Sequence, residues 1–279
     1  MKFCNVKWPI GICSWSLQKD VQGIAEVMNS TGVKHISLAL APALAENGQA
    51  YLDAVKKENW IITSTMLHFE HEDYTTLDTI KVTGGVAPDE KWPVILDHFS
   101  RAAKITAELN VRYILMHVGF LNHHDTAYAK KFTDRVRALA DIAVANNIVL
   151  IMETGQESAE EMLQFIESLN HPGLALNIDP ANLILYNTDE PVSAVKKIAR
   201  YVRHVHAKDA RRTTTPGTWG QEVPWGDGEV NTDAFLRALD AVGFAGAITV
   251  EREAGTQRVA DVTQAIERLS NWKKQEVLS

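Results

Sequence analysis

The sequence predicts an eight-stranded α/β barrel. Three observations predict it: short apolar segments alternate with longer segments of helical periodicity, there are eight such pairs, and ionisable residues stand at the ends of six consecutive strands. Strict alternation implies parallel strands, because each crossover helix returns the chain to the same edge of the sheet. Eight such units close most economically as a (β/α)8 TIM barrel, with a doubly wound open sheet as the structural alternative.

Each predicted strand is a short apolar segment or one in which apolar and polar residues alternate. The strands are predicted at residues 10–16, 34–40, 61–68, 111–118, 148–153, 174–179, 202–208 and 247–252. Longer segments with apolar residues at helical spacing predict the helices. They fall at residues 21–30, 49–57, 93–109, 129–145, 158–169, 193–201, 232–242 and 260–274. Ser158 and Glu161 form an S-x-x-E capping box that satisfies backbone donors where one helix begins.

The polarity of the sixth and eighth strands indicates which side chains face the barrel interior. Leu174 and Leu176 share one parity and should face the helices, while Asn177 and Asp179 have the other. Residues 248–251 repeat this pattern in the eighth strand. Large aliphatic residues outside and smaller or polar residues inside are what a barrel filled by layers of side chains requires.

Composition and charge limit the class of protein. The chain has 279 residues, of which 46% are hydrophobic and 23% charged, as in an ordinary globular protein. The formal net charge of −7 disfavours a nucleic-acid partner, because a phosphate backbone is normally met by a basic field. No internal repeat, low-complexity tract or linker interrupts the pattern. We therefore predict one domain spanning residues 1–279.

Cysteine usage and hydrophobicity predict where the protein works. Cys4 and Cys13 are too sparse for a disulfide framework or a four-thiolate zinc site, which favours a reducing cytoplasm. The longest segment free of charged and strongly polar residues, at 36–45, is far shorter than the roughly 18 residues that cross a bilayer. We predict a soluble, cytoplasmic protein with no membrane partner.

Two connections are longer than the others, at residues 69–90 and 209–231, and both leave the C-terminal ends of strands. Barrels keep their chemistry in the loops at this end. We expect the second of these loops to enclose the substrate.

The last inward positions of strands three to eight carry ionisable side chains. In order they are His68, His117, Glu153, Asp179, His206 and Glu251. These ends meet at one rim of a closed barrel, where the three carboxylates would repel each other unless a cation or protons lay between them. Three oxygen donors and one imidazole suit a hard divalent ion, Mn²⁺ or Mg²⁺ first, with Co²⁺ or Zn²⁺ also compatible.

Plainer interpretations exist for each residue. A carboxylate that ends a strand is often a helix cap or a solvated loop residue, and Asp179 before Pro180 could simply begin a turn. Four such residues at equivalent positions favour the metal site. For His68 and His117, substrate contact competes with structural hydrogen bonding, whereas His204 lies one layer deeper and is predicted to be a hydrogen-bonded barrel histidine.

Five segments together resemble the xylose-isomerase-like barrel superfamily of sugar isomerases, epimerases and endonuclease IV. They are METG, NIDPAN, HVHAKD, WGDGEVN and FLRALDAVGFAGAITVE. In its single-metal epimerase branch, the matching residues bind one divalent ion and the two glutamates also move protons. The resemblance thus implies Glu153, Asp179, His206 and Glu251 as metal ligands, with Glu153 and Glu251 as the catalytic acid and base.

Differences from these relatives are informative. Endonuclease IV has a histidine at the position of Asn182 and an Asp-x-His motif at the position of residues 220–222, and these complete its three-zinc cluster. This chain has Asn182 and Gly-Gln-Glu at those positions, so a three-zinc cluster is not expected here. Asn182 becomes a predicted substrate contact. Arg212 falls six residues after His206 and matches an arginine that contacts substrate in the epimerases. Trp15 is a further predicted contact, because indole faces commonly line sugar sites.

These observations predict a divalent-metal-dependent sugar isomerase or epimerase. A metal stabilises the negative oxygens of an enediolate, and glutamates on opposite sides of the sugar serve as acid and base. The main alternative is a metal-dependent dehydratase of a keto-sugar or keto-inositol on the same scaffold. An endonuclease IV-like repair enzyme and a noncatalytic sugar-binding barrel are the remaining alternatives. The predicted partner is a small sugar, and a homo-oligomer is left open.

Overall fold

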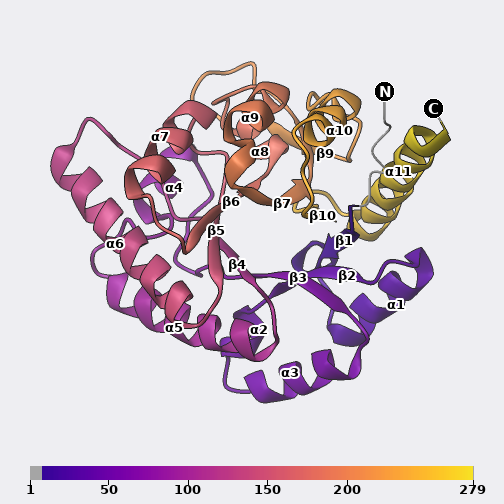
Figure 1. The fold of residues 1–279 in the computed structure, drawn as a ribbon, viewed down its shortest axis with the longest axis horizontal. Helices are drawn as coiled ribbons and strands as arrows, with labels where there is room; N and C mark the ends of the chain where they lie inside the picture. The colour runs from indigo at the N-terminus through magenta and orange to yellow at the C-terminus, as the bar shows by residue number, and fades with distance from the viewer. Residues whose placement is uncertain (1–7, 279) are drawn as a thin grey trace.

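A closed barrel of eight parallel strands forms the centre of the protein. The computed structural model describes residues 8–278, so Cys4 lies outside the described residues. Neighbouring strands follow the order β1, β10, β7, β6, β5, β4, β3, β2, and helices surround them (Figure 1). The strands are β1 (Ile10–Cys13), β2 (His35–Ala39), β3 (Ile61–Met66), β4 (Tyr113–Met116), β5 (Val149–Glu153), β6 (Leu174–Ile178), β7 (Val202–Ala207) and β10 (Ala247–Val250). The predicted (β/α)8 barrel is confirmed.

The helices lie between the strands in sequence. They are α1 (Val21–Thr31), α2 (Ala41–Leu44), α3 (Gly48–Lys57), α4 (Leu77–Thr83), α5 (Trp92–Glu108), α6 (Thr126–Ala145), α7 (Ala159–Leu169), α8 (Pro180–Leu185), α9 (Pro191–Ile198), α10 (Thr232–Ala241) and α11 (Arg258–Leu278). The predicted capping box is present at α7, where Ser158 Oγ accepts a hydrogen bond from Glu161 N and Glu161 Oε2 accepts one from Ser158 N. No helix among residues 8–278 has the length and hydrophobicity to cross a bilayer.

Side chains on the two faces of the strands have the predicted polarity. Leu174 and Leu176 belong to the hydrophobic core that packs the helices onto the barrel. Asn177, on the other face, is fully buried, and its Oδ1 accepts a hydrogen bond from His204 Nδ1 at 2.9 Å. His204 also lies 3.2 Å from Thr63 Oγ1 through Nε2. It is therefore the hydrogen-bonded barrel histidine that the sequence predicts.

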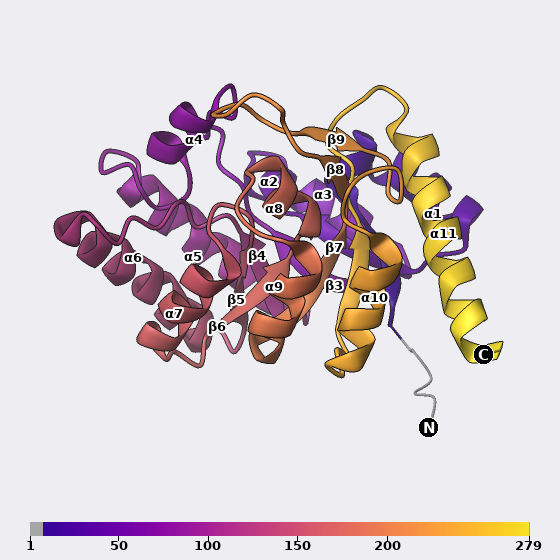
Figure 2. The same cartoon turned by 90° about the horizontal axis from the view of Figure 1, so that it is seen from above.

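The two long connections lie at the same end of the barrel (Figure 2). Residues 69–90 contain α4, and residues 209–231 contain an antiparallel hairpin of β8 (Asp209–Arg211) and β9 (Gln221–Val223). Neither α4 nor the hairpin was predicted, and every barrel strand except β5 ends earlier than predicted. The first strand, for example, ends at Cys13, because a 3-10 helix begins at Ser14.

Candidate active site

Four of the predicted residues converge at the C-terminal ends of neighbouring strands. Glu153 ends β5, Asp179 follows β6, His206 lies in β7 and Glu251 follows β10. One side-chain donor atom from each lies within 4.8 Å of the others, and all four residues are buried. The order of the strands explains this, because β5, β6, β7 and β10 are consecutive neighbours around the barrel. The group is a candidate metal centre, and metal binding itself stays a prediction.

The imidazole of His206 is surrounded by carboxylate oxygens. Its Nδ1 lies 2.7 Å from Glu153 Oε1, 3.3 Å from Glu251 Oε2 and 3.8 Å from Asp179 Oδ2. Although these atoms are close, neither His206 Nδ1 nor Asp179 Oδ2 has a hydrogen bond of acceptable geometry among the described residues. Buried polar atoms without partners are rare. A divalent cation shared by three oxygens and one nitrogen would satisfy them, so the donor set fits such an ion.

Asp179 caps a helix and also faces the candidate metal centre. Its Oδ1 accepts hydrogen bonds from Ala181 N at 2.8 Å and from Asn182 N at 3.1 Å, which caps the N-terminus of α8. Its Oδ2 is left pointing toward the candidate metal centre. The cap fixes the carboxylate plane, so the free oxygen is held in one direction.

Histidine 117 supports the carboxylate of Glu153. His117 Nε2 lies 2.8 Å from Glu153 Oε2, and its Nδ1 lies 2.5 Å from Gln156 Nε2. Burial lowers the pKa of His117, but the Glu153 carboxylate more than offsets this and raises the pKa to about 9. Burial conversely raises the pKa of Glu153, and the charges of His117 and His206 bring it well below its usual range. Glu153 is therefore an anion held between two imidazoles.

Two donors hold the carboxylate of Glu251. Trp15, in the 3-10 helix Ser14–Leu17, donates from Nε1 to Oε1 at 2.8 Å. Lys208 donates from Nζ to Oε2 at 2.9 Å and to Glu253 Oε2 at 2.6 Å. Lys208 is buried, and although burial lowers its pKa, Glu251 and the other carboxylates hold it well above its usual range. It is therefore a buried ammonium ion.

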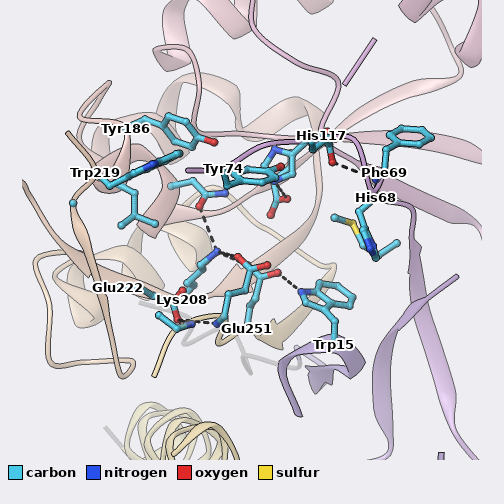
Figure 3. Close-up of a pocket in the computed structure, with 18 of the residues that line it drawn as sticks. Trp15, His68, Phe69, Tyr74, His117, Tyr186, Lys208, Trp219, Glu222 and Glu251 are labelled. Carbon is cyan, nitrogen blue, oxygen red and sulfur yellow. Dashed lines mark hydrogen bonds and ion pairs between the residues drawn. The ribbon is translucent and has the colours of Figure 1, made fainter. Parts of the chain in front are cut away.

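A cavity of about 820 Å³ opens above this centre (Figure 3). Of the predicted substrate contacts, Trp15, His68, His117 and Asn182 line it. Both long connections contribute to its rim, which agrees with the expectation for the loop at 209–231. The lining residues that sequence analysis did not select include Glu72, Tyr74, Tyr186, Lys208, Glu222 and Glu253.

Sequence signals existed for only some of these residues. Lys208 stands two positions after His206 and therefore has the same parity, which could have indicated that it reaches the same rim. Glu72 accepts hydrogen bonds from Phe69 N and Gly85 N and so folds its own loop. No pattern in the sequence foretells such a loop conformation.

Arg212 does not reach the cavity, contrary to the expectation that it contacts substrate. Its guanidinium donates to Asn187 Oδ1 at 2.8 Å, to the Asp189 carbonyl at 2.9 Å and to Glu190 Oε1 at 2.5 Å. Arg212 is not one of the described residues that line the cavity. The physical reason is that the connection between α8 and α9 offers three acceptors that fasten Arg212, and with it the hairpin, to the barrel.

Asp209 organises the glycine-containing loop that leads toward β10. Its carboxylate accepts hydrogen bonds from the backbone N–H groups of Ala210, Gly226, Gly228 and Val230. A Cβ atom at Gly228 would lie 2.2 Å from Asp209 Oδ1, which explains why glycine stands there. The last residue of HVHAKD and the glycines of WGDGEVN thus form one structural unit.

Neither residue at the positions of the endonuclease ligands belongs to the candidate metal centre. Asn182 lines the cavity and lies 3.4 Å from Lys208 Nζ through Oδ1. Glu222 Oε1 accepts hydrogen bonds from Arg252 and from the backbone N–H of Glu253. Among residues 8–278, Glu222 joins no group of His, Cys, Asp or Glu side chains that could hold an ion.

Comparison with known proteins agrees with this geometry. A family model described as "Xylose isomerase-like TIM barrel" matches residues 24–272. The chain belongs to this family. A xylose isomerase domain protein from Planctomyces limnophilus is 30% identical, with a TM-score of 0.88 over 98% of this chain and 99% of that one. The resemblance predicted from the sequence motifs is confirmed.

Other similar solved structures have lower sequence identity and support the fold alone. A structure from Mycobacterium smegmatis in complex with magnesium is 17% identical, with a TM-score of 0.74 and coverage of 97% of this chain and 98% of that one. A D-tagatose 3-epimerase-like protein is 16% identical, with a TM-score of 0.73 and coverage of 97% and 100%.

Two curated relatives match over shorter segments. An inosose dehydratase of Geobacillus thermodenitrificans (strain NG80-2) is 24% identical over 136 residues, which are 43% of this chain and 45% of that protein. The uncharacterized protein YihM of Escherichia coli (strain K12) is 29% identical over 114 residues, which are 36% and 35% of the two chains. The chain spans less than half the length of these relatives.

Proposed function

We propose that this xylose isomerase-like barrel is a divalent-metal-dependent isomerase or epimerase of a ketose or keto-sugar. One observation carries the proposal: two buried glutamates stand at the ends of β5 and β10, which are separated by β6 and β7, and each directs one oxygen toward His206. The other oxygen of each glutamate is held by a different partner. For Glu153 the second partner is His117, and for Glu251 it is Trp15. Such a pair could approach a bound sugar from two sides.

The proposed ion would be held by Glu153, Asp179, His206 and Glu251. Mn²⁺ and Mg²⁺ suit this oxygen-rich set best, and Co²⁺ and Zn²⁺ are also compatible. When bound, a divalent ion stabilises the negative oxygens of an enediolate.

The two glutamates supply the proton transfers. One carboxylate removes the proton from a carbon next to the carbonyl, which breaks the C–H bond. The other carboxyl group returns a proton to the opposite face for epimerisation, or to the neighbouring carbon for isomerisation, and no atom is lost. His117 and Trp15 keep the two carboxylates in fixed orientations.

A dehydratase is the second candidate, and Lys208 favours it. Its ammonium group lies beside Glu251 in the cavity lining. After the same C–H bond has broken, a β-hydroxyl group could accept a proton from Lys208 and leave as water when its C–O bond breaks. The match to an inosose dehydratase also favours this candidate.

Incubation with free ketoses, keto-sugars and keto-inositols in D₂O separates the candidates. Deuterium in the product without loss of water supports the isomerase or epimerase, and loss of water supports the dehydratase. Chelated protein is the control for the metal. Nicking of abasic DNA together with no reaction on any sugar would contradict both candidates.

A further inference from the structure

We infer that the cavity takes an uncharged two-ring glycoside, in which the reacting sugar ring lies on the buried floor and a second ring lies against aromatic side chains at the rim. This rests on the proposed function only for the statement that the floor ring reacts. The size, aromatic lining and charge of the cavity carry the rest.

The size and depth of the cavity indicate positions for two rings. A volume of about 820 Å³ lies toward the upper end for pockets that enclose drug-sized ligands and exceeds what a single sugar ring requires. On the floor, Glu153, Lys208 and Glu251 are 2%, 3% and 4% exposed. Tyr74 at the rim is 43% exposed. The cavity therefore runs from the candidate metal centre to the surface, with room beyond the first ring.

Three aromatic rings from separate segments meet at the rim. Tyr74 precedes α4, Tyr186 follows α8, and Trp219 lies in the β8–β9 hairpin. The distance between ring centroids is 4.7 Å for Trp219 and Tyr186 and 6.5 Å for Trp219 and Tyr74. Figure 3 shows these rings across the cavity from Trp15. The flat apolar faces of these rings suit the C–H face of a second ring.

The indole nitrogen of Trp219 is enclosed at the base of the ring. Its Nε1 is buried and has no partner among the described residues, although buried indole N–H groups usually have one. Because this nitrogen is enclosed by the protein, a ligand in the cavity would meet the ring face of Trp219 and not its N–H. The hairpin thus provides a stacking surface at the rim.

Charges around the cavity favour a neutral ligand. Six of the described residues that line it are glutamates, and two are the permanent cations Lys208 and Arg258. Both cations are already engaged: Lys208 lies between Glu251 and Glu253, and Arg258 donates to the Glu253 carbonyl. A carboxylate or phosphate on the ligand would therefore find neither Lys208 nor Arg258 free to pair with it.

Calorimetric titration of the Mn²⁺-loaded protein tests the inference. The probes are methyl and phenyl 3-oxoglycopyranosides, in the α and β forms of the gluco and galacto series, together with the matching phenyl glucuronides. The best phenyl glycoside should bind about tenfold more tightly than its methyl counterpart, and more tightly than the charged glucuronide. Equal affinities, preference for the glucuronide, or no binding by any phenyl glycoside would overturn the inference.

Variants locate the second ring. Trp219→Ala should bring the phenyl-to-methyl affinity ratio close to one, and Trp219→Phe should retain most of it, because the stacking face remains. Thr218→Ala is the matched control: among the described residues, the Thr218 hydroxyl bonds only to Thr213 and Thr215 within the hairpin, and Thr218 is not one of those that line the cavity. A ratio unchanged in Trp219→Ala would contradict the proposed position.

The ratio of phenyl to methyl glycoside affinity can be measured whether or not the protein turns these compounds over. Deuterium exchange in D₂O, measured on the same compounds, reports on the proposed function alone. Tighter binding of the phenyl glycosides without deuterium exchange would contradict the proposed reaction and support the inference. Deuterium exchange without tighter binding of the phenyl glycosides would support the proposed reaction and contradict the inference.

Discussion

His117 and Glu153 meet at 2.8 Å between Nε2 and Oε2, while the other oxygen of Glu153 faces the candidate metal centre. The imidazole thus fixes the orientation of a carboxylate to which we assign both metal binding and proton transfer. His117 also lines the cavity, so it can act on Glu153 and on a ligand.

Replacing His117 by Ala should separate metal binding from proton transfer. We expect metal content to stay close to that of the wild type, since four ligands remain, while exchange of the substrate α-hydrogen falls by about 10²-fold, the usual contribution of a positioned acid or base. Elemental analysis and exchange in D₂O measure the two effects. Exchange at the wild-type rate would show that Glu153 needs no support from His117.

The two functions of Asp179 can be separated by two substitutions. Asp179→Ala removes both the free oxygen and the cap of α8, so it should abolish metal binding and lower the free energy of unfolding of the metal-free protein by about 1 kcal/mol. Asp179→Asn keeps a capping oxygen, so it should weaken metal binding with little loss of stability. We expect one ion per wild-type chain by elemental analysis. Three zinc ions per chain, or full metal content in Asp179→Ala, would contradict the site.

Glutamine variants of Glu153 and Glu251 test proton transfer apart from metal binding. At saturating metal the amide oxygen can still coordinate, so a residue that is only a ligand should recover most of its activity. We expect turnover to stay about 10²-fold lower, because an amide cannot accept the proton. In an epimerase, one variant should exchange the α-hydrogen of a single epimer without inverting it. Near-normal turnover by both metal-saturated variants would contradict the mechanism.

The loop held by Asp209 should be sensitive to substitution. Asp209→Ala leaves the partly buried N–H of Gly228 and the buried N–H of Val230 without their acceptor, and should destabilise the fold by about 1 to 3 kcal/mol. Asp227→Ala, in the same loop, removes a partly exposed ion pair with Arg268 and should cost less than about 1 kcal/mol. Denaturant unfolding compares the two variants. Similar losses would argue against this role for Asp209.

The sequence predicts the barrel and the candidate metal centre better than it predicts the rim. Strand-end residues such as Glu153 and Glu251 are found by counting parity, because the geometry of a closed parallel barrel brings strand ends together. Lys208 was accessible to the same reasoning and was missed. Arg212 was misplaced because its direction depends on acceptors at Asn187 and Glu190, in a connection whose conformation no periodicity encodes.

Glu157 should make stability depend on pH. It is buried just before α7, where Oε1 accepts a hydrogen bond from Leu121 N at 2.6 Å and Oε2 has no partner among the described residues. Burial raises its pKa from 4.5 to about 8. The folded state therefore binds a proton more tightly than the unfolded state, so the free energy of unfolding falls as pH rises from about 4.5 to about 8 and is level above that.

Glu157→Gln should remove this dependence, because the amide stays neutral at every pH. Relative to the wild type, the variant should gain stability steadily between pH 5 and pH 8, by more than about 1 kcal/mol at the upper end. Glu161→Gln is the matched control with the opposite sign: the Ser158 hydroxyl and N–H lower the pKa of Glu161, so this carboxylate stabilises the fold above its unfolded pKa and its loss should destabilise. Urea unfolding across this pH range measures both variants. A constant difference between Glu157→Gln and the wild type from pH 5 to pH 8 would show that Glu157 titrates normally in the folded protein.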